Sequence, residues 1–144
     1  MKFMILVPAN EDTEADVLPS SEELGKMGKF SEELVKAGVL VAGEGLRASS
    51  KGARITFGNA GKTSIKDGPF TESRELIAGF FIIQVKSRDE AIAWMSRAPF
   101  PEGTTLEIRQ LFSDEDFAPV DPTGELREHD AKLRAQAEKQ HGKS

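Results

Sequence analysis

Three apolar runs along the chain predict strands that are buried on both faces. They span residues 2–8, 39–46 and 77–85, and apolar side chains fill odd and even positions alike. A strand with one solvated face would instead alternate strictly between apolar and polar residues. Glu44 is the one charged residue in the second run. A fourth run, 105–112, alternates in its first half and predicts the last strand.

Two segments predict amphipathic helices that begin with the same signal. Ser20 stands three residues before Glu23, and Ser87 stands three residues before Glu90, which is the spacing of a capping box. Gly38 follows the first segment where a glycine commonly ends a helix. The intervening segment 10–19 is acidic and predicts a loop. The apolar positions recur at helical spacing and include Leu24, Met27, Leu34 and Val35, then Ala91, Trp94, Met95 and Ala98.

A hairpin and a rigid corner separate the second and third long strands. The short runs 54–57 and 62–65 alternate, and Gly58-Asn59-Ala60-Gly61 between them supplies turn residues. The tetrapeptide Asp67-Gly68-Pro69-Phe70 follows. Pro69 lacks an N–H and cannot continue a ladder, so a corner is expected there. Residues 125–139 are almost wholly polar and predict a solvated or partner-supported helix that frays.

The order β-α-β, hairpin, β-α-β predicts an α+β, ferredoxin-like split βαβ fold with both helices on one face of a mixed sheet. The apolar strands need a cover on the other face as well. A second copy packed sheet to sheet is the expected cover, because closed homodimers are the commonest oligomers. The chain's own C-terminal segment is the alternative. The predicted domain covers residues 1–118, and a polar, helical extension covers 119–144.

Composition removes several classes of site and partner. The chain has no cysteine and only two histidines, His129 and His141, both in the polar tail. Disulfides, thiolate metal sites and a histidine cluster in the main domain are therefore not expected. The formal net charge is -5, with both signs spread along the chain, so neither nucleic acid nor an anionic membrane is an expected partner. No apolar run is long enough to span a membrane, and we expect a cytoplasmic protein.

Several motifs together resemble a known family. They are Gly43-Glu44-Gly45-Leu46, Lys66-Asp67-Gly68-Pro69-Phe70, Glu72-Ser73-Arg74-Glu75 and Ile77-Ala78-Gly79-Phe80. In this order of elements they resemble the DGPF branch of the YCII-related domain family, over roughly residues 1–118. The resemblance implies a dimeric α+β barrel, the ferredoxin-like homodimer also seen in small monooxygenases and muconolactone isomerases. It implies no particular reaction.

A catalytic pair known in the family does not carry over to this chain. Some YCII-type proteins are suspected enzymes because a His–Asp pair lies in their pocket between sheet and helix. The first helix here, residues 21–37, contains no histidine. Glu44 and Asp67 are therefore the candidate catalytic groups. Glu44 is read as a pocket general base or ligand acceptor, or else as a structural carboxylate at a strand end, paired with Arg47 or Arg54 or held by backbone N–H groups.

Three further residues are candidates for ligand binding. Arg54 is a candidate anion-orienting group, and Glu72 stands near enough in sequence to Asp67 to form a carboxylate pair. Lys29 is the third candidate, although a solvated i,i+4 pair with Glu33 is its ordinary reading. Asp67 itself is read either as a ligand at a pocket mouth or as the cap of an Asx-turn. No cofactor or metal is expected.

Three functions remain open from the sequence. The first is a homodimeric small-molecule binding or accessory module without a cofactor. The second is a cofactor-free lyase, isomerase or hydrolase that uses Glu44 or Asp67 as general base. The third is an interaction module that docks a partner through the C-terminal helix. The sequence does not identify the ligand.

Overall fold

The computed structural model describes residues 1–72 and 75–142 and divides into two compact units, Met1–Gln110 and Leu111–Ser144. The first unit ends at Gln110, whereas the sequence placed the end of the domain at residue 118. The predicted domain boundary stays a prediction. Ser73 and Arg74, which belong to one of the motifs above, lie outside the described residues.

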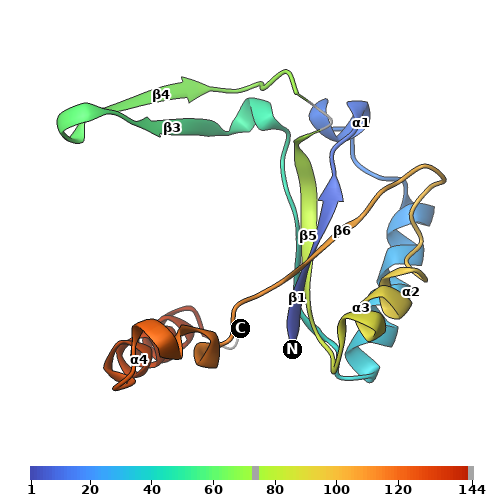
Figure 1. Cartoon of the computed structure of the whole chain (residues 1–144). Coiled ribbons are helices and arrows are strands. Elements are labelled where there is room, and N and C mark those ends of the chain that lie inside the picture. Colours follow the sequence, from blue (N-terminus) through green and yellow to red (C-terminus); the bar gives the residue numbers. More distant parts are fainter. Residues whose placement is uncertain (73–74, 143–144) are drawn as a thin grey trace. The chain divides into compact units, whose positions relative to one another are not determined.

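The first unit is an α+β structure built on a four-stranded sheet (Figure 1). Its strands are β1 (Lys2–Pro8), β2 (Leu40–Gly45), β5 (Ile77–Gln84) and β6 (Glu107–Gln110), in the order β2-β5-β1-β6. Every neighbouring pair is antiparallel, so the predicted mixed sheet is wrong. The parallel strands of each β-α-β unit are not neighbours, because one strand of the other unit lies between them.

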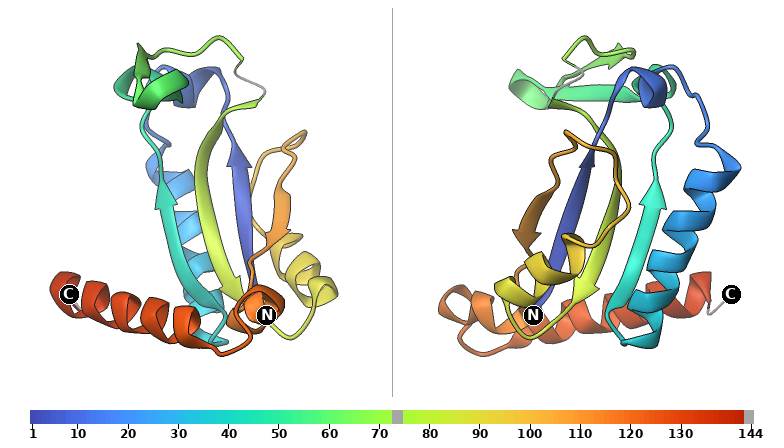
Figure 2. Two further views of the ribbon diagram at one scale, coloured as in Figure 1. Left: turned by 60° about the vertical axis from the view of Figure 1, so that its left-hand side comes forward. Right: turned by 90° about the vertical axis from the view of Figure 1, so that its right-hand side faces the viewer.

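The two predicted helices are present and lie on the same face of this sheet (Figures 1 and 2). In α2 (Ser21–Lys36) the Ser20 hydroxyl accepts a hydrogen bond from the Glu23 N–H at 3.1 Å, and the capping box is complete. Gly38 ends that helix with φ +71°. In α3 (Arg88–Met95) Ser87 caps the Glu90 N–H, but the Glu90 carboxylate accepts from the Lys86 N–H instead.

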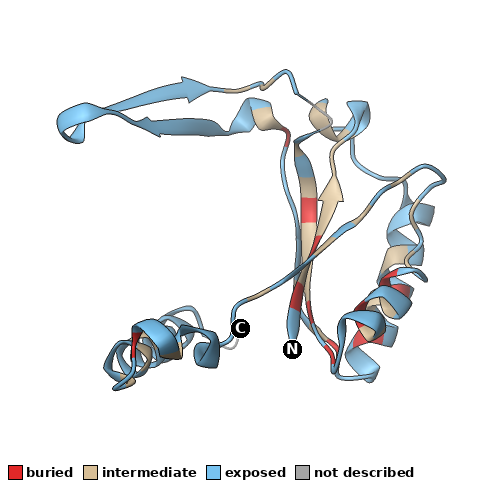
Figure 3. Ribbon diagram, in the orientation of Figure 1, coloured by how far each residue is buried: buried red, intermediate tan, exposed pale blue. Residues whose placement is uncertain are grey.

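The core of this unit lies between the helices and one face of the sheet (Figure 3). Phe3, Ile5 and Ile83 are at most 2% exposed on that face. The register places Met4 opposite Ile82 and Leu6 opposite Phe80 on the other face, where these apolar side chains are only half-buried. We call this other face the open face. Within the described residues of Met1–Gln110 the core packs against one side of these apolar strands only. The core on the helix side also contains Phe30, Leu34, Val39, Val85, Ala91 and Met95.

The predicted hairpin forms a separate two-stranded sheet, made of β3 (Ala53–Phe57) and β4 (Thr63–Asp67). We call residues 53–67 the arm. A 3-10 turn, η1 (Ser49–Lys51), precedes it, and a second one, η2 (Asn59–Gly61), forms its tip. Every residue of β3 and β4 is exposed (Figure 3). The arm extends on the side of the sheet opposite α2 and α3 (Figure 1).

The segment predicted as an acidic loop contains a short helix, α1 (Glu11–Glu14). Asn10 accepts from the Thr13 N–H at 2.9 Å, and Thr13 accepts from the Asn10 N–H at 2.8 Å. This capping box uses Asn and Thr in place of the Ser and Glu that marked the two longer helices. No helix in the described part of the chain is long and apolar enough to cross a membrane.

The second unit contains a 3-10 segment, η4 (Asp114–Val120), and the predicted C-terminal helix, α4 (Glu125–His141). Asp121 is 5% exposed. Its carboxylate accepts from the N–H groups of Leu126 and Arg127 and from the Arg127 guanidinium. Burial raises the pKa of Asp121, but these hydrogen bonds outweigh burial and leave that pKa below its ordinary value.

Candidate functional site

A cleft of about 780 Å³ opens at the end of the sheet where β1 and β2 finish and β5 begins. We call it the end cleft. The α1 segment and the start of α2 form its other wall. Its apolar lining consists of Val7, Val17, Leu18, Pro19, Leu46 and Ala78. Its polar lining consists of Asn10, Asp12, Thr13, Asp16, Glu23 and Arg47.

An ion pair joins the two walls of the end cleft. Asp16 Oδ2 accepts from Arg47 Nε at 3.0 Å and from Arg47 Nη2 at 2.6 Å, while Asp16 Oδ1 accepts from the Ala48 N–H at 2.8 Å. Arg47 and then the Ala48 N–H hold the pKa of Asp16 below its ordinary value. The same contact raises the pKa of Arg47. Both groups therefore stay charged at neutral pH.

A second set of hydrogen bonds ties the wall of the end cleft to the Asp67–Phe70 corner. Glu14 accepts from the Ser49 N–H at 3.0 Å and from the Ser49 hydroxyl at 2.5 Å. The Ser49 Oγ accepts in turn from the Phe70 N–H at 3.0 Å. The Gly68 N–H donates to the Gly52 carbonyl. The corner thus supports the α1 wall through η1, and it does not line the cleft.

Arg54 and Glu72, two predicted binding residues, meet at this corner. The Arg54 guanidinium lies 3.9 Å from the centre of the Phe70 ring, and Arg54 Nη1 lies 3.6 Å from Glu72 Oε2. Hydrogen bonds from its own backbone N–H and from Thr71, and then the charge of Arg54, lower the pKa of Glu72. Asp67 is exposed at the base of the arm, opposite Ala53. None of these residues lines the end cleft.

Glu44 lies on the open face and not between the sheet and the helices. Leu40 pairs with the buried Ile83, but a bulge follows at Val41, so Glu44 pairs with Phe80. The extra residue moves the following side chains to the other face. In the part of the chain that the structure describes, Glu44 forms an ion pair with neither arginine: Arg47 binds Asp16 and Arg54 binds Glu72.

Lys29 lies on the exposed side of α2 and does not line the end cleft. The predicted ion pair between Lys29 and Glu33 is not present among the described residues. The Glu33 carboxylate is bound by Arg97 instead. This contact joins α2 to the segment that follows α3.

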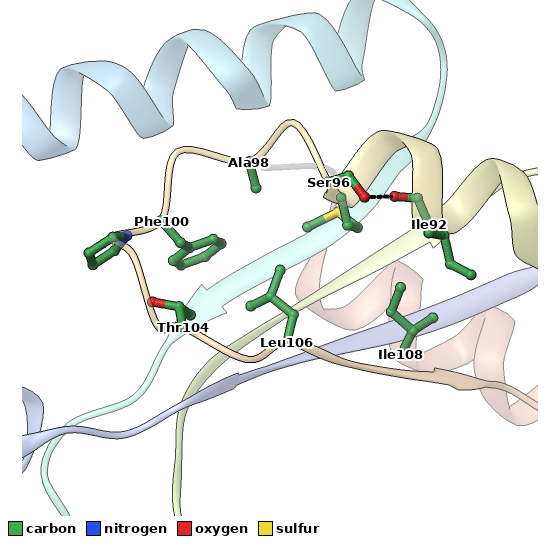
Figure 4. Close-up of a pocket in the computed structure, with 9 residues that line it drawn as sticks. Ile92, Ser96, Ala98, Phe100, Thr104, Leu106 and Ile108 are labelled. Carbon is green, nitrogen blue, oxygen red and sulfur yellow. Dashed lines mark hydrogen bonds between the residues drawn. The ribbon is translucent and has the colours of Figure 1, made fainter.

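A second cavity of about 420 Å³ lies between α3 and β6 (Figure 4). Phe100, Leu106 and Ile108 point into it, and Thr104 lies at its edge. The Ser96 hydroxyl donates a hydrogen bond to the Ile92 carbonyl oxygen at 2.7 Å. No charged side chain lines this cavity. It is an extension of the core, and it lacks the fixed polar groups that orient a ligand.

Sequence reasoning missed the main polar features of the end cleft. Asp16 and Arg47 are 31 positions apart, and the segment around Asp16 carries no motif that announces its partner. The one available signal was the density of acidic residues in 10–19. Among the described residues, no group of three or more His, Asp or Glu side chains could hold a metal ion.

The family model of the YCII-related domain matches residues 1–114 and confirms the resemblance to that family, while the DGPF branch stays a prediction. An uncharacterized protein of Rhizobium meliloti (strain 1021) is 47% identical over 56 residues, which are 37% of this chain and 44% of that protein. The chain therefore spans less than half the length of this curated relative.

One similar solved structure is 5-chloro-2-hydroxyhydroquinone dehydrochlorinase from Burkholderia phenoliruptrix AC1100, in complex with 2,5-dihydroxybenzoquinone. The superposition has a TM-score of 0.39 and 16% sequence identity, and it covers 80% of this chain and 98% of that chain.

Proposed function

Because the chain belongs to the YCII-related domain family, we propose that it is a homodimeric small-molecule binding module whose ligand occupies the end cleft. The observation that carries this proposal is the cleft itself. Its volume of about 780 Å³ lies within the range of roughly 300–1,000 Å³ that is usual for small-molecule sites. It also combines apolar walls with a fixed ion pair.

The apolar lining supplies the binding energy in this proposal. Leu18 is 84% exposed and Val17 is 53% exposed, and both side chains line the cleft. A ligand that covers a leucine of this kind removes it from water, which is worth about 1.5–3 kcal/mol. Leu46, 43% exposed, offers a further apolar contact from the opposite wall.

The polar lining favours binding over proton transfer. Asp16 is neutralised by Arg47, and Glu23 accepts from the Ser20 hydroxyl at the start of α2. Two of the three carboxylates that line the cleft thus have structural partners, and Asp12 is the third. Glu44, the candidate general base, is on the open face and outside the cleft. A cleft furnished in this way orients a ligand, and we assign no reaction to it.

The proposed assembly is the ferredoxin-like α+β barrel, without a cofactor. The strand order β2-β5-β1-β6 with two interleaved β-α-β units supports this finer description. The open face supports the dimer, because Met4, Leu6, Phe80 and Ile82 form a half-buried apolar surface there. Sheets bury such faces against another layer, and a second copy supplies one with closed symmetry.

A fragment screen tests the binding function. We expect neutral and charged aromatic and aliphatic fragments to raise the melting temperature of the wild-type protein. The variant Leu18→Ser should bind the same fragments about tenfold more weakly, because it removes one apolar contact. Val35→Ser is the matched control, since Val35 is 61% exposed on α2 and outside the cleft. Equal binding to wild type and Leu18→Ser would overturn the proposal.

A further inference from the structure

The arm has one apolar face and one polar face. The register pairs Ile55 with Ile65 and Phe57 with Thr63 on one side. On the other side it pairs Arg54 with Lys66 and Thr56 with Ser64, as the alternation of strand side chains requires. Ile55 is 59% exposed, Phe57 is 82% exposed and Ile65 is 67% exposed. The described residues of Met1–Gln110 therefore leave the apolar face of the arm largely exposed.

Such a hairpin calls for a packing partner. A two-stranded sheet by itself is marginally stable in water, and it becomes stable when its apolar face packs against another surface. Exposed apolar side chains that gather on one face commonly mark an interaction site. Both considerations indicate that something covers Ile55, Phe57 and Ile65 in the functional protein.

The charge of the arm identifies the kind of surface that covers it. Residues 53–67 carry three cations, Arg54, Lys62 and Lys66, against the single carboxylate of Asp67, and Arg54 is paired with Glu72. The whole chain has a formal net charge of -5, so the rest of it is strongly acidic. Residues 10–23 alone contain six carboxylates and no lysine or arginine. The arm is thus complementary in charge to other surfaces of this same chain.

The position of the arm indicates the same partner. The arm extends on the side of the open face, opposite α2 and α3 (Figure 1). A second copy that covers Leu6 and Phe80 would lie on that side, within reach of the arm. Its own arm would reach back by two-fold symmetry, as an isologous interface requires.

We propose that the arm of each protomer clasps the second copy of the chain, with Ile55, Phe57 and Ile65 packed against the partner's surface. This inference rests on the homodimer of the proposed function and adds a second contact region to it. The basic side chains of the arm steer it toward acidic segments of the partner, and the apolar side chains provide the contact area.

Dimer affinity measured by analytical ultracentrifugation separates the two claims. The variant Ile55→Ser/Ile65→Ser should weaken the dimer about tenfold or more, because two apolar contacts are lost. Thr56→Ala/Ser64→Ala, on the polar face of the same strands, is the control and should leave the affinity unchanged. Leu6→Lys should abolish the dimer through the open face. A monomeric wild type overturns the homodimer, whereas a dimer insensitive to Ile55→Ser/Ile65→Ser overturns the clasp alone.

A spin-label experiment tests the clasp without altering its apolar residues. The chain has no cysteine, so Asn59→Cys at the tip of the arm can carry a single nitroxide. Protein that carries the nitroxide at position 59 but no ¹⁵N is mixed with ¹⁵N-labelled wild type. The same mixture after reduction of the nitroxide serves as the reference. We expect broadening of amide signals in the labelled copy. Unbroadened signals in a mixture that sediments as a dimer would show that the arm does not contact the partner.

Discussion

Gly68 lies so close to Ser49 that a Cβ atom at position 68 would collide with the Ser49 carbonyl oxygen. The corner Asp67-Gly68-Pro69-Phe70 is therefore packed directly onto the η1 turn. The Ser49 hydroxyl also joins Phe70 to Glu14, the last residue of α1, and the preceding residues Asp12 and Thr13 line the end cleft. These contacts make the corner a support for the cleft.

Gly68→Ala should destabilise the protein by about 1–3 kcal/mol, because the backbone of η1 must move to admit a methyl group. Chemical denaturation of the variant measures this loss. Gly28→Ala is the control, since nothing lies within 4 Å of a Cβ at Gly28. Gly28 is inside α2, where alanine should stabilise by about 0.5–1 kcal/mol. Equal effects at the two positions would contradict the packing at the corner.

Asp16→Asn should loosen the wall of the end cleft. Asparagine tolerates the left-handed φ of 57° at this position, so the change mainly removes the charge that binds Arg47. We expect the Ala48 amide, which donates to Asp16 Oδ1, to lose protection from hydrogen exchange. Asp12→Asn, in the neighbouring helix α1, should leave this amide protected. Unchanged protection in Asp16→Asn would contradict the ion pair's role.

The same ion pair predicts a dependence on pH. Arg47 and the Ala48 N–H lower the pKa of Asp16 from its usual value of 3.8. A carboxylate with a lowered pKa in the folded state stabilises fully above its usual pKa and loses that contribution as the pH falls through the folded value. Protection of the Ala48 amide should therefore be constant above pH 3.8 and decline below it. A decline that begins near neutral pH would contradict this assignment.

Asp121→Asn should fray the start of α4. The side-chain amide places an NH2 group among N–H donors that the carboxylate now satisfies, so one of them loses its acceptor. We expect faster exchange of the Leu126 and Arg127 amides and a lower helix content by circular dichroism. Asp130→Asn breaks only an exposed pair with Arg134, which contributes little. Equal fraying in both variants would contradict the capping role of Asp121.

Local sequence signals predicted the elements well. Ser20 with Glu23 and Gly38 mark the two ends of α2, because capping involves residues three or four positions apart. Local signals did not predict on which face of the sheet Glu44 lies. Strict alternation from Leu40 would place Glu44 on the helix side, but the bulge at Val41 reverses the side chains that follow. No local pattern in the sequence announces a bulge.

The end cleft could not be predicted, because its walls come from distant segments. The contacts Asp16–Arg47 and Glu14–Ser49 each span more than 30 positions. An acidic, proline-containing segment such as 10–19 is typical of a solvated loop. Whether it closes over an apolar surface depends on tertiary packing, and neither composition nor spacing encodes that packing.

Chemical-shift mapping of the screened fragments tests the central claim most directly. Each fragment that raises the melting temperature is titrated into ¹⁵N-labelled protein, and the shifted amides are placed on the structure. We predict that the changes concentrate around the end cleft, at Val7, Leu18, Leu46 and Ala78. Changes concentrated at Phe100 and Leu106 beside α3, or no saturable change at all, would contradict a ligand site in the end cleft.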